Sequence, residues 1–545
     1  MNPWCGARIT TAGLAVLAGL FFLGCQPVPS ESPPLPDSDI PPTVGTSAAR
    51  AADPSSAPSS PPTSVAEPAA YPLRETWDAI YFAESKVGYA RTSYYAASER
   101  GQSLVRIEAA SELNLERFGQ SVRQKMTFHS LETPEGQLLR CGSSMINQGG
   151  TGAPVEINTS ARVEGNQLSL EITTLGRRDS RTIAWEPTWG GFFAVEQSLE
   201  RQPMRPGEQR QLQALLPGLN QLGTIQLTAR EMEATDTLTG NQSLLRIDAR
   251  LQLANTSLDQ TLWTDPAGQS IKSVTPALQQ VTYRTTRDVA LEQPAQGSRF
   301  DLGERTVVQL KLPSRDPHGT QQAIYRARLS QGDVLSAFAR GATQQIRGGA
   351  EGSAEIIVRA LRPDTVLGTD FPADSPSGPA DLRANALIQS DDPLIHQLAL
   401  SVAGQETDHW KIAVALESLV KQYVNNKSFA QAMASAADVV RSREGDCTEH
   451  AVLLAALCRA RGIPARVAIG LVHASSVGGF AYHMWTEAWI ADRWIPLDAT
   501  LARGGIGAAH LKVSHSNLDG VDPFSQFLPV FQLLGNLKLE VVDAR

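Results

Sequence analysis

The sequence predicts a multi-domain α+β protein, in which one or more β-rich N-terminal domains are followed by an α+β domain. Apolar and polar residues alternate in short runs between residues 73 and 295, which is the period of half-buried strands. Near residue 390 the apolar spacing changes to steps of three and four, which indicates helices. A chain of 545 residues with 42% hydrophobic and 19% charged residues has enough apolar side chains for three or four globular domains.

The charge distribution disfavours one class of partner. The formal net charge is −8, and lysine and arginine are spread along the chain without a basic run. Nucleic-acid binding needs a concentrated positive surface. We therefore expect no nucleic-acid partner.

Residues 1–25 have the proportions of a signal peptide. Arg8 precedes an apolar stretch at 9–23, which is shorter than the roughly 20 residues of a membrane span. The run that closes it resembles the lipobox of bacterial lipoproteins, with Phe22 where that family usually has Leu: Phe22-Leu23-Gly24-Cys25. The resemblance implies that Cys25 is lipidated and that the protein is anchored at the periplasmic face of the cell envelope. Gln26 implies the outer membrane, and a plain signal peptide or an uncleaved anchor is the alternative.

Residues 26–72 form the predicted tether. This segment holds 13 of the 34 prolines, interleaved with Ser, Ala and Thr. Such a composition cannot bury enough apolar surface to fold. We expect a disordered spacer between the anchored end and the folded domains.

Residues 73–295 are predicted to form a β-rich domain. Two alternating runs, 77–82 and 87–94, flank a short polar turn, and two later runs flank the turn Asp265-Pro266-Ala267-Gly268. Long antiparallel strands with one apolar face favour a curved sheet or an open barrel. The pattern loosely resembles the half-barrels of periplasmic lipoprotein-binding proteins, and an unrelated β-sandwich is the alternative. Further predicted strands are 104–109, 113–117, 122–128, 168–172, 225–228 and 244–251.

A small β module is predicted at 300–375 and the α+β domain at 386–545. The expected strands of the small module are 306–312, 323–327 and 354–359. In the second domain, Asp392 caps a helix that begins with Pro393 and runs to Gly404. Thr407 or Asp408 caps the next helix, and a short helix covers 436–441.

The cysteine count favours a free thiol. Cys5 leaves with the signal peptide and Cys25 would carry lipid, so Cys141, Cys447 and Cys458 remain. An odd number in an oxidising compartment leaves at least one without an intramolecular disulfide partner. We expect Cys458, about 16 Å along the same helix from Cys447, to be a buried core residue.

Cys447 is predicted to begin a helix. Asp446 and Glu449 have the spacing of a capping box, and Gly445 permits an unusual entry angle. A thiol at this position meets the positive end of the helix dipole and unpaired N–H groups, which favour the thiolate. The carboxylate of Asp446 opposes this effect unless capping directs it to the backbone.

Two histidines could exchange a proton with this thiol. His450 shares the helix face of Cys447, whereas His483 lies on a predicted strand, 481–490. A two-residue turn would pair residue 490 with 493, which places Asp498 opposite Trp485 and diagonal to His483. A carboxylate there would fix the tautomer of the imidazole. We therefore favour Cys447, His483 and Asp498 as the catalytic residues.

Three motifs together resemble the bacterial transglutaminase-like family: Gly445-Asp446-Cys447-Thr448-Glu449-His450-Ala451, His483-Met484-Trp485-Thr486-Glu487 and Trp494-Ile495-Pro496-Leu497-Asp498-Ala499-Thr500. The resemblance covers about residues 390–505. It implies a papain-like α+β fold, with Cys447 as nucleophile, His483 as general acid/base and Asp498 as the orienting residue. It implies acyl transfer at an amide of a protein or peptide through a thioester. No cofactor is expected, and nothing resembles a calcium loop.

Other interpretations of these residues remain open. Gln431 is a candidate oxyanion donor besides the Cys447 amide. Trp485, Trp489 and Trp494 could wall a substrate cleft, but packing is the favoured role. A metal site of Cys447, His450 and His483 lacks metal-ligand spacing. The alternative function is a non-enzymatic envelope binding or assembly lipoprotein with a vestigial thiol site.

Overall fold

The structure is a computed structural model, and it describes residues 71–149, 154–253, 257–293, 300–314, 316–330, 332–363, 371–429, 433–519, 528–533 and 535–545. The predicted signal peptide with Cys25, almost all of the predicted tether, and Gln431 lie outside these residues. Among the helices in the described ranges, none is both long and apolar enough to cross a membrane.

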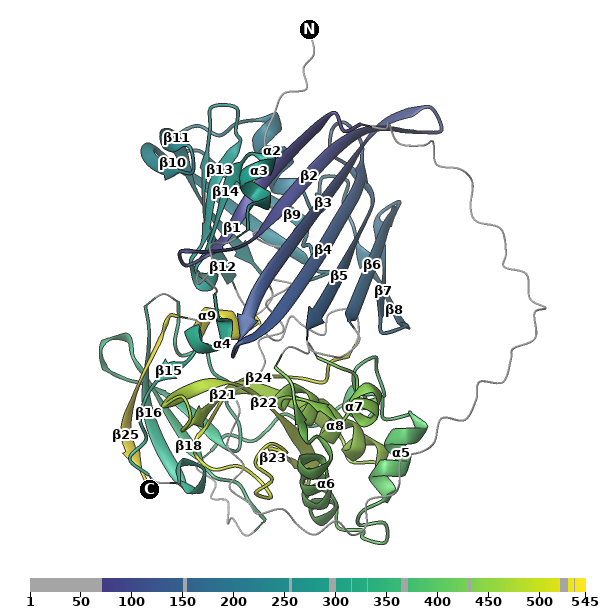
Figure 1. The fold of residues 1–545 in the computed structure, drawn as a ribbon, viewed down its shortest axis with the longest axis vertical. Helices are drawn as coiled ribbons and strands as arrows, with labels where there is room; N and C mark the ends of the chain where they lie inside the picture. Colours follow the sequence, from purple (N-terminus) through teal and green to yellow (C-terminus); the bar gives the residue numbers. More distant parts are fainter. Residues whose placement is uncertain are drawn as a thin grey trace, which may run out of the picture.

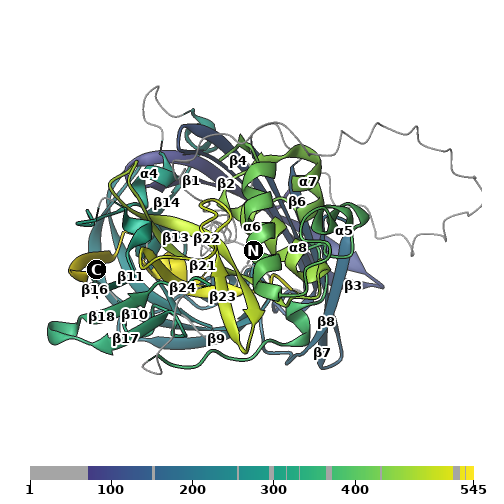
Figure 2. The same cartoon turned by 90° about the horizontal axis from the view of Figure 1, so that it is seen from below.

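The N-terminal part is one antiparallel sheet of fourteen strands that curves strongly (Figures 1 and 2). Its strand order is β8-β7-β6-β5-β4-β3-β2-β1-β14-β13-β12-β11-β10-β9, so β8 and β9 are its edges. This confirms the expected curved sheet. The strands are β1 Arg74–Phe82, β2 Ser85–Glu99, β3 Gln102–Arg117, β4 Gln120–Glu132, β5 Leu138–Gly149, β6 Val155–Glu164, β7 Gln167–Thr174, β8 Arg177–Ala184, β9 Gln209–Leu215, β10 Leu222–Thr237, β11 Gly240–Gln252, β12 Ser257–Thr264, β13 Ser270–Thr275 and β14 Gln280–Thr285.

Alternation explains why these residues form strands. In β6 and β7 every second side chain is buried, so one face packs on the core and the other meets solvent. The runs 104–109 and 113–117, expected as separate strands, are parts of the single strand β3. Helix α2 (Ala194–Arg201) and the short helices α3 (Arg287–Leu291) and α4 (Leu302–Arg305) accompany the sheet.

A second sheet joins two distant parts of the chain. Its order is β17-β18-β16-β25, with β16 at Gln322–Leu329, β17 at Gln344–Gly348, β18 at Ala354–Arg359 and β25 at Leu537–Ala544. The C-terminal strand β25 therefore pairs with β16, more than 200 residues earlier. The strand expected at 306–312 shrinks to β15 (Val308–Gln309), because it pairs only with residues 479 and 480 of β22.

The C-terminal domain packs helices against a five-stranded sheet (Figure 1). The sheet runs β15-β22-β21-β24, and β23 also pairs with β22. Its longer strands are β21 Ala465–Ala474, β22 Gly479–Ile490, β23 Arg493–Leu497 and β24 His510–Ser516. The helices are α5 Pro393–Leu400, α6 His409–Tyr423, α7 Ala436–Ser442, α8 Cys447–Ala460 and the C-terminal α9 Leu528–Leu533. A two-residue parallel pair, β19 (Asn426–Lys427) and β20 (Glu444–Gly445), precedes α8.

The predicted helix starts are confirmed. Asp392 caps α5 and Asp408 caps α6, each accepting hydrogen bonds from the first turn. Helix α5 ends at Leu400, before the expected Gly404. Helix α8 is buried on nearly every side, as expected for the central helix of a domain core.

Candidate active site

Helix α8 begins at Cys447, as the capping box predicts. Asp446 Oδ1 accepts a hydrogen bond from the Thr448 amide at 2.8 Å, and Glu449 Oε2 accepts one from the Asp446 amide at 2.9 Å. Gly445 has φ +155°, and a Cβ there would lie 2.3 Å from the Cβ of Glu449. Burial and the neighbouring Asp446 carboxylate raise the pKa of Glu449 well above its usual range. The sequence thus places the sulfur at the first residue of a tightly capped helix.

The sulfur of Cys447 lies at an uncovered part of the β22 edge. Residues 479–480 of this edge pair with β15 and residues 486–490 pair with β23. Between them, the Met484 amide donates a hydrogen bond to Cys447 Sγ at 3.2 Å. The start of α8 therefore contacts β22, the strand that carries His483, in the gap between β15 and β23.

The other two described cysteines, Cys141 and Cys458, carry free thiols. Both of those are buried, and burial raises the pKa of Cys458 to about 12. They are core residues, as expected for Cys458, and a nucleophilic role for Cys447 requires its reduced form.

The structure brings His483 and Asp498 together. The β22–β23 hairpin pairs residue 490 with 493 and 486 with 497, which is the predicted register. His483 Nε2 lies 2.8 Å from Asp498 Oδ2, and both side chains are almost fully buried. The other carboxylate oxygen, Oδ1, accepts hydrogen bonds from the Thr500 amide at 3.0 Å and the Thr500 hydroxyl at 2.6 Å.

A second histidine, which sequence reasoning missed, contacts the same carboxylate. His510, the first residue of β24, places Nε2 3.1 Å from Asp498 Oδ2. Burial opposes ionisation of Asp498, yet the charge and hydrogen bond of His483 and the hydrogen bond of His510 lower its pKa well below the usual range. The carboxylate is therefore held as an anion inside the domain. The only sequence signal for His510 is a polar residue beginning an alternating run.

His450, the alternative proton partner, has a different contact. Its Nδ1 donates to the carbonyl oxygen of Asp446 at 2.6 Å, one helical turn earlier. Burial lowers its pKa, so the neutral imidazole is favoured. Of the two candidate proton partners, His483 is therefore the one that is hydrogen-bonded to an acidic side chain.

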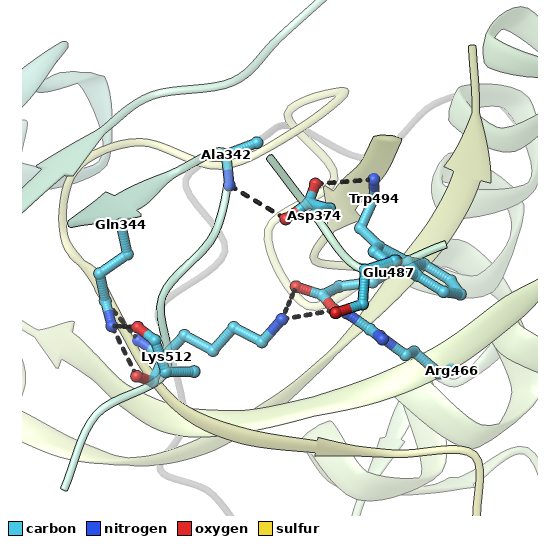
Figure 3. Close-up of polar contacts among 9 residues, drawn as sticks. Ala342, Gln344, Asp374, Arg466, Glu487, Trp494 and Lys512 are labelled. Atoms are coloured by element: carbon cyan, nitrogen blue, oxygen red, sulfur yellow. Dashed lines mark hydrogen bonds and ion pairs between the residues drawn. The ribbon is translucent and has the colours of Figure 1, made fainter. Parts of the chain in front are cut away.

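Two of the three tryptophans of the hairpin are buried packing residues, in line with the favoured prediction, whereas Trp489 is only partly buried. Trp485 and Trp494 are each 2% exposed. The guanidinium of Arg466 stacks 3.8 Å from the Trp494 ring centre, and Arg466 also binds Glu487 at 2.8 Å. Figure 3 shows this network, in which Lys512 reaches Glu487 from β24. Glu487 of β22 is therefore part of a buried ionic cluster with Arg466 and Lys512.

In the described part of the chain, one group of three side chains is placed so that it could bind a metal ion. The set is His483, Asp498 and His510, whose ligand atoms lie within 4.8 Å of one another. It differs from the Cys447, His450 and His483 set considered from the sequence. The hydrogen bonds from the two imidazoles to one carboxylate account for the closeness of these three residues.

A helix that begins with a cysteine and packs on an antiparallel sheet carrying a His–Asp pair defines the papain-like class of thiol fold. Residues 396–499 match the family model of the transglutaminase-like superfamily. The chain therefore carries a transglutaminase-like domain, preceded by a large β domain. No protein among the curated sequences matches the chain.

Three solved structures resemble parts of the chain. One is a candidate cysteine protease from Cytophaga hutchinsonii, with 18% identity, coverage of 42% of this chain and 89% of that chain, and a TM-score of 0.27. Another is a β-barrel-like protein of a domain of unknown function, DUF1849, from Brucella abortus, with 6% identity, 39% and 94% coverage and a TM-score of 0.28. The third is a candidate protease from Parabacteroides distasonis, with 13% identity, 63% coverage of each chain and a TM-score of 0.16.

Proposed function

We propose that this protein is a thiol-dependent amide hydrolase or acyltransferase that acts on protein or peptide substrates outside the cytoplasm. Cys447 would be the nucleophile, His483 the general acid/base, and Asp498 the residue that orients the imidazole. The observation that carries the proposal is the buried His483–Asp498 pair, located beside the Met484 amide that contacts Cys447 Sγ. The predicted lipid anchor at Cys25 would hold the enzyme at the membrane surface.

The first half of the reaction acylates the enzyme. Because Nε2 of His483 faces Asp498, proton exchange with the thiol falls to Nδ1. Reduced Cys447 gives its proton to His483, and the thiolate attacks the carbonyl carbon of the substrate amide. The new C–S bond forms as the carbonyl oxygen becomes an oxyanion. Its collapse breaks the C–N bond, and His483 protonates the leaving amine.

The second half releases the acyl group. Water or a second amine attacks the thioester carbonyl while His483 accepts its proton. The C–S bond then breaks, and the released product carries the acyl group as an acid or a new amide. We favour hydrolysis because water is always present. Asp498 stabilises the imidazolium in both halves and does not itself take up the proton.

Thiol labelling tests this role without a known substrate. The full-length protein is first reduced, and iodoacetamide incorporation at Cys447 is followed by mass spectrometry at pH 7. We expect His483→Ala to slow labelling at least about tenfold, because the thiolate loses its imidazolium partner. His473→Ala is the matched control, because His473 is a buried histidine of the neighbouring strand whose Nε2 faces the Leu310 carbonyl. Equal labelling of the His483→Ala and wild-type proteins would contradict the proposal.

The size of the fourteen-stranded sheet favours a second candidate function, an envelope binding or assembly role that does not need the thiol. A strain carrying Cys447→Ala separates the two. If it has the phenotype of a deletion strain, the thiol is needed. A wild-type phenotype would leave the sheet as the functional part.

A further inference from the structure

A turn of the large sheet lies against the start of the catalytic helix. Strands β3 and β4 are joined by Phe118 and Gly119, at the end of the sheet that faces the transglutaminase-like domain (Figure 1). Arg117, the last residue of β3, donates a hydrogen bond to Asp446 Oδ2. The two residues are 329 positions apart in sequence. Their side chains are only 5% and 1% exposed, so this is a buried ion pair.

The turn is fixed on both sides. Asp301 accepts hydrogen bonds from the amides of Phe118 at 3.0 Å and Gly119 at 2.8 Å. On the other side, the Phe118 ring meets Phe429 edge-to-face at 5.5 Å, and the Phe429 amide donates to Gln120 Oε1 at 2.7 Å. These contacts fix the position of the turn and therefore the position of Arg117, the residue before it.

The backbone of the turn has the conformation of a two-residue hairpin. Phe118 has φ +49° and Gly119 φ +76°, a left-handed pair that matches the twist of a two-residue hairpin. Glycine adopts this conformation readily, whereas phenylalanine is disfavoured there. The Phe118 ring packs against Phe429 of the other domain. The Phe118 ring thus contributes to the contact between the two domains.

The charge of Asp446 matters for the neighbouring thiol. One carboxylate oxygen caps the Thr448 amide and the other faces Arg117. A lone anion directly before Cys447 would oppose thiolate formation, whereas a paired one would not. Among the described residues, the titratable groups at or near the start of α8 also include Glu444 on β20, Glu449 and His450 on α8, His483 on β22 and Asp498 after β23.

We propose that Arg117 is a positioning residue of the thiol site: it neutralises the Asp446 cap, so that the large sheet sets the reactivity of Cys447. This inference rests on the proposed function of Cys447. It gives the β domain a direct part in the chemistry. It also resolves the conflict between the capping role of Asp446 and its unfavourable charge.

The test is the pH profile of Cys447 alkylation in reduced full-length protein. Arg117→Gln leaves the Asp446 anion uncompensated, so we expect the midpoint to move to higher pH and labelling at pH 7 to slow about tenfold. Asp446→Asn retains the cap, since Asn caps as well as Asp, but leaves the Arg117 cation near the thiol. We expect its midpoint to move to lower pH. The double variant should return close to the wild-type profile.

Opposite shifts and their cancellation distinguish charge from structure. If Arg117 only braced the fold, both single variants would shift in the same direction and the double variant would be no better than either. That result, or an unchanged profile in Arg117→Gln, would overturn the inference. If Arg117→Gln does not fold, two further variants apply: the double variant removes both charges of the Arg117–Asp446 pair, and Arg117→Lys keeps a cation. Both should then retain the wild-type midpoint, and a shift in either would also overturn the inference.

Two controls complete the design. Arg123→Gln removes a cation from β4 of the same hairpin, but its side chain is 48% exposed and pairs with Glu112 at the surface, so no shift is expected. His483→Ala reports on the proposed function separately. Failure of the proposed function appears as unchanged labelling in His483→Ala, whereas failure of this inference appears in the Arg117 and Asp446 variants alone.

Discussion

Ion pairs of the fourteen-stranded sheet and of the transglutaminase-like domain can be compared directly. On the sheet, Arg250 binds Asp259 through two hydrogen bonds, and their side chains are 58% and 50% exposed. In the C-terminal domain, Arg466 binds Glu487, and their side chains are 8% and 5% exposed. Both pairs join residues on adjacent antiparallel strands. The pairing chemistry is the same, and the solvent around it differs.

Charged residues contribute differently to stability in the two regions. At the sheet surface, water screens the pair and replaces either partner when the other is lost. In the C-terminal domain Glu487 also binds Lys512 from β24, at 2.6 and 2.7 Å, so one buried anion faces two cations (Figure 3). Removing the anion leaves two buried charges without compensation. Ionic contacts are therefore structural requirements in one region and minor contributors in the other.

The largest expected effect follows from truncating the acidic partner in each region. Glu487→Ala should lower the free energy of unfolding by about 3–5 kcal/mol, because it leaves buried cations unpaired. Asp259→Ala should change it by less than about 1 kcal/mol, because its partner is solvated. Urea unfolding followed by tryptophan fluorescence measures both. Similar losses in the two variants would remove the contrast between the regions.

A smaller effect is expected from pH, which titrates the same buried anion. Burial disfavours the charge of Glu487, but Lys512 and Arg466 lower its pKa from 4.5 to about 2. This contribution to stability is complete above about pH 4.5 and is lost as the pH falls toward 2. Between pH 6 and pH 3 the loss from this group is about 2 kcal/mol.

The Glu487→Gln variant isolates the contribution of Glu487 to the pH dependence of stability. Glu487→Gln has no proton to bind at this position, so its stability should fall by about 2 kcal/mol less than that of the wild type between pH 6 and pH 3. Urea unfolding at the two pH values measures the difference. Parallel curves for Glu487→Gln and the wild type would show that Glu487 does not titrate abnormally.

Local features of the fold could be predicted from the sequence, because short-range physics fixes them. The Asp446–Glu449 capping box and the 490–493 hairpin turn each depend on residues within a few positions of one another. Strand β3 was divided in the prediction because small and polar residues between 109 and 113 obscure its alternation. The pairing of β1 with β14 and of β16 with β25 could not be predicted, since these partners are about 200 residues apart and no local pattern specifies them.

In the candidate site too, contacts between residues close in the sequence could be predicted and contacts between distant residues could not. His483 and Asp498 belong to one hairpin, so strand alternation alone predicts their contact. His510 reaches Asp498 from β24, which lies on the far side of β21 in the sheet. Arg117 reaches Asp446 from another domain. Both additions depend on strand order and domain docking, which neither periodicity nor spacing encodes.

The smallest expected effect concerns His510. Here two histidines of the same sheet, His510 and His473, are compared. His510→Ala removes one of the hydrogen bonds that hold Asp498 ionised, so the pKa of Asp498 should rise and its hold on the His483 imidazole should weaken. A hydrogen bond to a charged group contributes about 1.5–3 kcal/mol, so we expect alkylation of reduced Cys447 at pH 7 to slow about tenfold. His473→Ala, at a histidine that binds the Leu310 carbonyl, should leave the rate unchanged. If the two variants slow labelling equally, His510 acts through packing and not through the Asp498 carboxylate.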